Sequence, residues 1–158
     1  MSISNSVAPR VSSSAERRHV MAVCAQATVA ELASSIAAIA PDIAVTVVRP
    51  PELGLVMLQG RVGCDGPPFN AGEATVARAA VRLATGEMGL GYVLGRSLEK
   101  ARLAAIIDAL AQVPVNSAAL QTALISPVEA RRTRERDTRA AETAATKVDF
   151  FTLVRGED

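Results

Sequence analysis

The sequence predicts an α+β fold: a mostly antiparallel four-stranded sheet packed with N-terminal and C-terminal helices, then a long polar helix and a short apolar tail. Apolar residues recur with helical spacing on both sides of a central region, where β-branched and alternating segments are separated by Pro and Gly. At 158 residues the chain is long enough for one ordinary domain. We therefore expect a disordered arm over 1–14, a single α+β domain over 15–126, and a partner-contacting helix and tail over 127–158.

Two helices are predicted near the N-terminus. The first covers 15–26 and follows a Ser-rich arm that has no apolar run typical of a signal peptide. Thr28 and Glu31 have the spacing of a capping box, which begins a second helix. This helix should end near Ala40, because Pro41 cannot continue its hydrogen bonds.

Four strands are predicted in the middle of the chain. The β-branched run 43–48 and the run 55–62 should pair antiparallel across a turn marked by Pro and Gly at 50–54, and 64–70 should be a loop. The segment 73–84 fits a helix by its Ala content and a strand by its alternation. We interpret it as a strand, because alternating apolar residues after Thr85-Gly86-Glu87 look like the second half of a hairpin.

The C-terminal third is predicted to be helical. Ser97 is a suitable N-cap for a helix that Pro114 closes, and a short helix is expected over 118–124. Ser126 and Pro127 then supply the N-cap and first residue of a long polar helix that runs to about Thr146.

Composition excludes several classes of protein. The 17 basic and 16 acidic residues nearly balance, which argues against a nucleic-acid binder. No apolar stretch approaches the roughly 20 residues of a membrane helix, so we expect a soluble, cytoplasmic protein without a membrane partner. Cys24 and Cys64 lack metal-site spacing and are expected to be reduced thiols, and the single histidine, His19, is expected on a helix surface. We predict no metal site and no catalytic residue.

Four stretches together carry a family resemblance. They are FNAGEATVARAAVRL at 69–83, GYVLGR at 91–96, IDAL at 107–110 and VDFFTLVRG at 148–156. In this order they resemble the PhnG family of the bacterial carbon-phosphorus lyase system, and the likeness extends over residues 15–158. Ala77 departs from the pattern, where a hydroxyl residue such as Thr is expected.

The resemblance implies a function within an assembly. Members of this family act with the PhnH, PhnI and PhnJ core subunits and with PhnL. Together they displace adenine from ATP by a phosphonate, giving a ribose 1-phosphonate 5-triphosphate. ATP is thus a substrate of the complex, and no cofactor is expected on this chain alone. The resemblance favours a scaffold or co-catalytic subunit that is not active by itself.

Two groups of residues are candidates for functional contacts. Arg78, Arg82 and Arg96 could hold an anionic substrate group through bidentate bonds. The alternative is that they are solvated residues of the sheet face or pair with Glu52, Glu73 or Glu99. No phosphate-binding loop of a familiar type accompanies them. The second group lies in the apolar tail, which could complete this domain's own sheet or anchor it to a partner. Its members are Phe150, Phe151, Leu153 and Arg155.

The helix before that tail is also a candidate for partner contact. Arginines and acidic residues alternate over 129–142 without a continuous apolar stripe. A helix that is polar all round either bridges two bodies or is unstable alone, so we interpret it as contacting a partner. The alternative is a helix exposed to solvent.

Overall fold

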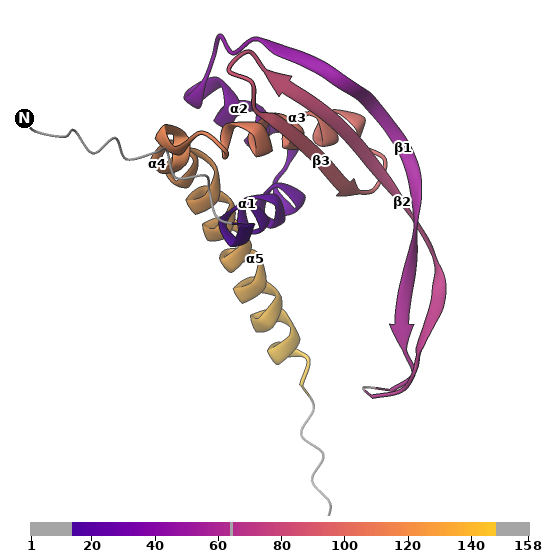
Figure 1. The fold of residues 1–158 in the computed structure, drawn as a ribbon. Coiled ribbons are helices and arrows are strands. Elements are labelled where there is room, and N and C mark those ends of the chain that lie inside the picture. The colour runs from indigo at the N-terminus through magenta and orange to yellow at the C-terminus, as the bar shows by residue number, and fades with distance from the viewer. Residues whose placement is uncertain (1–13, 64, 148–158) are drawn as a thin grey trace, which may run out of the picture.

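A three-stranded antiparallel sheet in the order β1-β2-β3 forms one layer of the fold, and the helices gather on one side of it (Figure 1). The structure is a computed structural model, and it describes residues 14–63 and 65–147. The strands are β1 (Val45–Arg61), β2 (Pro68–Leu83) and β3 (Met88–Leu94). The helical elements are α1 (Ser14–Gln26), α2 (Val29–Ile39), α3 (Leu98–Leu110), η1 (Pro114–Asn116), α4 (Ser117–Leu120), η2 (Gln121–Ile125) and α5 (Ser126–Ala145).

The expected four-stranded sheet is wrong, because the segments predicted as its first two strands form the single strand β1. The prolines at 50 and 51 lie inside β1, where its pairing with β2 shifts register between Val47 and Arg49 and again between Arg49 and Glu52. β1 is an edge strand, so one of its two sides has no neighbouring strand. The N–H groups that proline lacks therefore need not remove hydrogen bonds from the sheet. A bulged edge therefore replaces the predicted turn.

The predicted hairpin between β2 and β3 is confirmed. Residues 73–84 are almost entirely strand, which resolves the ambiguity between helix and strand, and β2 begins earlier than expected, at Pro68. β2 pairs with β3 from Val76↔Leu94 to Arg82↔Met88. Gly86 occupies the connecting turn with φ of 108°, a conformation that favours glycine.

The caps of α2 and α3 are confirmed, whereas the predicted start of the last helix is wrong. The Thr28 backbone N–H donates to Glu31 Oε2 at 2.7 Å, and the Glu31 N–H donates to Thr28 Oγ1 at 3.2 Å. The chain is helical without interruption from Ser117 to Ala145, and Ile125 before Ser126 has helical dihedrals. The π-helical segment η2 directly precedes Pro127, so the hydrogen bond that proline cannot donate is lost where the pattern is already irregular.

Helix α3 packs unusually close to β3 because small residues line both sides of the contact. An added Cβ at Gly91 would lie 1.8 Å from the Ala101 carbonyl oxygen, and one at Gly89 would lie 1.9 Å from that of Ala105. The core itself is aliphatic, as the composition predicts. Its largest fully buried apolar side chains are Leu32, Ile107, Leu110, Leu124, Val81 and Val128.

Candidate functional site

The face of the sheet opposite the helices carries large apolar side chains. Pairing and the alternation of side chains place the following residues on this open face: Arg49 and Glu52 of β1, Val76, Arg78, Ala80 and Arg82 of β2, and Met88, Leu90, Tyr92 and Leu94 of β3. On β3 the intervening residues Gly89, Gly91 and Val93 point toward the helices and are buried. The glycines thus face the core, and the large side chains face outward.

The open face is apolar over an area that would normally be polar. Leu90 and Tyr92 are each 52% exposed and Leu94 is 71% exposed. Val76 and Ala80 beside them on β2 are buried, yet they do not belong to the core cluster beneath the helices. An antiparallel sheet with one solvated face usually alternates apolar and polar residues. The β3 part of this face is apolar instead, which is typical of a surface that another body covers.

The far half of the β1–β2 hairpin forms an arm that extends away from the helices (Figure 1). We define the arm as residues 55–61 and 68–75, which lie beyond the part of β2 that pairs with β3. Leu55 is 65% exposed and Met57 is 51% exposed. An isolated two-stranded ribbon is marginally stable in water. Cover from another body would therefore stabilise the arm.

The three arginines predicted as anion ligands are spread along the sheet. Arg78 Nε donates to Glu52 Oε1 at 2.7 Å, so this guanidinium already has a carboxylate partner. Arg82 lies on the same face, roughly 13 Å along the strand at about 3.3 Å per residue. It is level with the first residue of β3, whereas Arg96 lies two residues after the last residue of that strand. The fold therefore brings Arg78 and Arg82 onto one face but places Arg96 at the other end of β3.

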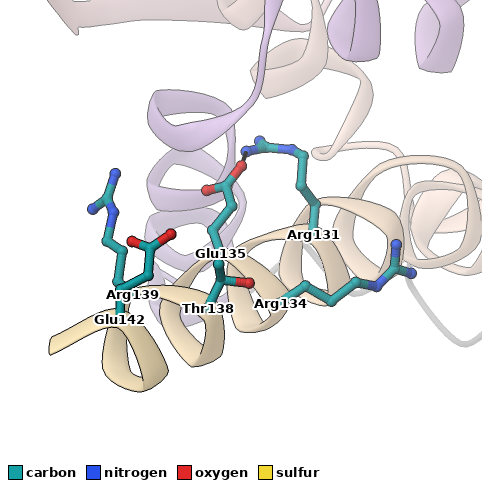
Figure 2. A pocket seen from close by; sticks show the side chains of 6 residues that line it. All are labelled: Arg131, Arg134, Glu135, Thr138, Arg139 and Glu142. Carbon is teal, nitrogen blue, oxygen red and sulfur yellow. Dashed lines mark hydrogen bonds and ion pairs between the residues drawn. The ribbon is translucent and has the colours of Figure 1, made fainter. Parts of the chain in front are cut away.

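Helix α5 is anchored to the body at its beginning. Val128 is buried, and the Arg131 guanidinium donates to Glu31 Oε1 at 2.8 Å and to the Gln26 carbonyl oxygen at 3.0 Å. Figure 2 shows the shallow depression that follows, whose lining comes from this one helix. It is lined by Arg131, Arg134, Glu135, Thr138, Arg139 and Glu142. Residues from one helix do not enclose a ligand, so this depression does not define a substrate pocket.

The contact between Glu31 and Arg131 predicts a pH-dependent stability. The hydrogen bond from Arg131 lowers the pKa of Glu31 from 4.5 to about 2. A lowered folded-state pKa stabilises the protein above the unfolded pKa, and that contribution is lost as the pH falls from about 4.5 toward 2. We expect Arg131→Gln to lower the free energy of unfolding at pH 7, and the difference from the parent to shrink as the pH is lowered to 3. Urea unfolding at several pH values measures it.

Arg132→Gln is the matched control for that experiment. Arg132 is the next arginine on α5 and is exposed. Its substitution should leave stability unchanged at both pH values. A deficit in Arg131→Gln that stays constant between pH 7 and pH 3 would show that Glu31 is not its ionised partner.

Each of three ionisable groups in the helical body is buried or paired with another group. Asp108, 1% exposed, accepts hydrogen bonds from Arg17 Nε and Nη2, both at 2.7 Å, and from the Leu90 backbone N–H at 2.8 Å. Burial raises the pKa of the Cys24 thiol to about 12, which makes it a poor nucleophile. His19 is half exposed and lies 3.4 Å from Glu129. Over residues 14–63 and 65–147, no group of three His, Cys, Asp or Glu side chains could hold a metal ion.

None of the helices in the described part of the chain is by itself long and apolar enough to cross a bilayer. One pair of segments bent by 109°, Leu98–Leu110 and Pro114–Ala145, meets the requirements of length and composition.

Part of the predicted site lies outside the described residues. Phe150, Phe151, Leu153 and Arg155 belong to the segment after Lys147, so their contact with a partner stays a prediction. Cys64 also lies outside the described part. Sequence reasoning missed the open face and the arm. A signal for the open face was present, since glycines alternate with Leu90, Tyr92 and Leu94, and the helix must pack on the glycine side if it is to approach closely.

The fold defines a small α+β protein whose exposed apolar sheet face and extended arm are those of a component of a larger assembly. Comparison with known proteins agrees with this class. The model of the family described as "Phosphonate metabolism protein PhnG" matches residues 15–156. A protein of Rhizobium meliloti (strain 1021), named alpha-D-ribose 1-methylphosphonate 5-triphosphate synthase subunit PhnG, is 53% identical over 144 residues, covering 91% of this chain and 92% of the relative. The chain belongs to the PhnG family.

Proposed function

We propose that this chain is a subunit of a ribose 1-methylphosphonate 5-triphosphate synthase and takes part in phosphonate utilisation. The observation that carries the proposal is the 53% identity to a subunit of that name, over nearly the whole of both chains. The exposed arm supports it, because such a ribbon is more stable inside an assembly than alone.

The reaction proposed for the whole complex uses ATP and a phosphonate as substrates. A phosphonate oxygen forms a bond to the C1′ atom of the ATP ribose while the bond from C1′ to adenine breaks, and adenine leaves with a proton. Within this complex the chain acts as a scaffold or co-catalytic subunit and binds no cofactor alone. In support, the thiol of Cys24 is buried with a raised pKa, and His19 has an exposed carboxylate neighbour but no nucleophile within the contacts described.

The partners we propose are the PhnH, PhnI and PhnJ core subunits together with PhnL, in the cytoplasm. A pull-down tests this. The tagged full-length chain, co-expressed with PhnH, PhnI and PhnJ of its own organism, should retain them, whereas the tagged chain expressed with an unrelated protein should not retain that protein. A version ending at Thr146 separates two roles of the tail: loss of retention assigns it to a partner, and unchanged retention assigns it to its own domain. Failure of the full-length chain to retain any subunit would contradict the proposal.

Contact of Arg78, Arg82 and Arg96 with phosphonate or triphosphate oxygens is part of this proposal. Because Arg78 already pairs with Glu52 at 2.7 Å, we expect Arg82→Ala to slow adenine release by the assembled complex more than Arg78→Ala does. Arg102→Ala, on the exposed side of α3, is the control. Parental rates for Arg78→Ala, Arg82→Ala and Arg96→Ala in intact complexes would exclude the anion site.

A further inference from the structure

We propose that the open face of the sheet is the surface on which a different subunit of the synthase docks, and that this subunit presents an apolar surface without excess positive charge. The inference rests on the proposed function and specifies where the contact lies. It depends on the orientation of β3, the state of its free edge and the charges on the open face.

The orientation of β3 shows that the apolar side chains are not needed for this domain's own core. The residues of β3 that face α3 are Gly89, Gly91 and Val93, and α3 approaches so closely that a Cβ at either glycine would collide with its backbone. The larger side chains Leu90, Tyr92 and Leu94 lie on the other side, half to three-quarters exposed. Exposing them to water costs free energy that burial against a partner recovers. Tyr is among the residues that most often dominate such interfaces.

The beginning of the free edge of β3 is closed to an added strand. The outward backbone N–H of Leu90 donates to Asp108 Oδ2 at 2.8 Å, and the Met88 carbonyl oxygen accepts from Gln112 Nε2 at 2.7 Å. Both side chains come from the α3 region and occupy the groups that an incoming strand would need. The partner therefore docks on the face of β3, through side chains, more readily than along its edge.

The charges of the open face disfavour a second copy of this chain as the occupant. Three arginines, Arg49, Arg78 and Arg82, share the face with one carboxylate, Glu52. Glu52 is already within 2.7 Å of Arg78 and 3.6 Å of Arg49. A two-fold pairing of identical faces would bring these arginines together without a free carboxylate for Arg82. A neutral or acidic apolar surface of a different protein meets no such repulsion.

The last described part of the chain leads away from the open face. Helix α5 carries the chain away from the sheet and ends far from β3 (Figure 1). The helices from which it departs lie on the opposite side of the sheet from the open face.

The test places a charge within the apolar part of the open face. The double variant Leu90→Glu and Leu94→Glu, in the full-length chain co-expressed with PhnH, PhnI and PhnJ, should reduce the retained subunits roughly tenfold or more. Tyr92→Ala, which adds no charge, should reduce them in the same direction. The matched control is Val115→Glu, because Val115 is an apolar residue 82% exposed in η1, away from the sheet. Thermal unfolding of each purified variant should match the parent, since the substituted side chains are outside the core.

The outcomes separate this inference from the proposed function. If the parent and both open-face variants retain the subunits equally, the docking surface lies elsewhere while the proposed function stands. If the parent retains none, both fail. Gel filtration of the isolated chain tests the other occupants. A parental dimer that the Leu90→Glu and Leu94→Glu substitutions dissociate would assign the face to a second copy. Binding of the dye ANS tests the tail. If the isolated chain that ends at Thr146 binds more ANS than the isolated full-length chain, the face is assigned to the tail.

Discussion

Replacing Gly91 by alanine should destabilise the fold by about 3 kcal/mol, the upper end of the usual cost of overpacking a core. The new Cβ would lie 1.8 Å from the Ala101 carbonyl oxygen and 2.9 Å from the Ala105 nitrogen. Both atoms are helix backbone, so α3 must move away from β3 as a unit. We expect the melting temperature, followed by circular dichroism at 222 nm, to fall by roughly 6–12 °C.

Gly54→Ala is the matched control, since it makes the same change in a strand glycine on the sheet. A Cβ at Gly54 meets nothing closer than the Arg78 guanidinium carbon at 3.7 Å, an ordinary contact. This variant should melt within a few degrees of the parent. Equal melting temperatures for Gly91→Ala and Gly54→Ala would show that α3 does not pack on β3 as closely as described.

Replacing Arg17 by methionine should have the second largest effect. It leaves the Asp108 carboxylate, 1% exposed, with the Leu90 N–H as its remaining partner among the contacts described. Breaking a fully buried ion pair in this way costs about 3–5 kcal/mol. Arg17 is 38% exposed, so water reaches this side of the pair and we expect about 2 kcal/mol, measured by urea unfolding at pH 7.

A second variant distinguishes the charge from the shape of the pair. Arg17→Met combined with Asp108→Asn removes the buried charge and keeps an oxygen that can accept from Leu90. The double variant should therefore be more stable than Arg17→Met alone, and the two substitutions should be non-additive. Strictly additive losses would contradict the view that the cost comes from an unpaired buried carboxylate.

Local signals in the sequence predicted much of the fold. The capping box of Thr28 and Glu31 and the N-cap Ser97 are satisfied by bonds within three residues, so they do not depend on the rest of the molecule. The strand prediction for 73–84 was also confirmed. Its alternating residues pair with those of β3, the strand that follows it directly in the chain.

The errors arose where distant neighbours decide the structure. Pro50 and Pro51 indicate a turn locally, but they are accommodated because β1 lies at the edge of the sheet, and position within a sheet is not a local property. Ser126 and Pro127 indicate a helix start, yet the preceding helix continues through them. The anchoring of α5 by Arg131 to Glu31 joins residues 100 positions apart, which no spacing rule reveals.

The candidate site was less predictable than the fold. Arg78 and Arg82 were correctly expected on one face, and one of the alternatives, pairing with Glu52, is what Arg78 does. The outward side of β3 could not be read from its alternation alone, since Leu90, Tyr92 and Leu94 would ordinarily face the core. Gly89 and Gly91 carry the signal in the sequence, and the close approach of α3 to them decides which side is outward.

The most direct test of the proposed synthase role is adenine release from ATP in the presence of methylphosphonate. It should be measured with this chain alone, with PhnH, PhnI, PhnJ and PhnL together, and with all five proteins. If this chain is a synthase subunit but not itself the main catalyst, we expect adenine to be released only by the complete set of five proteins. Adenine released by the purified chain alone, or at an unchanged rate by the set that lacks it, would contradict this role.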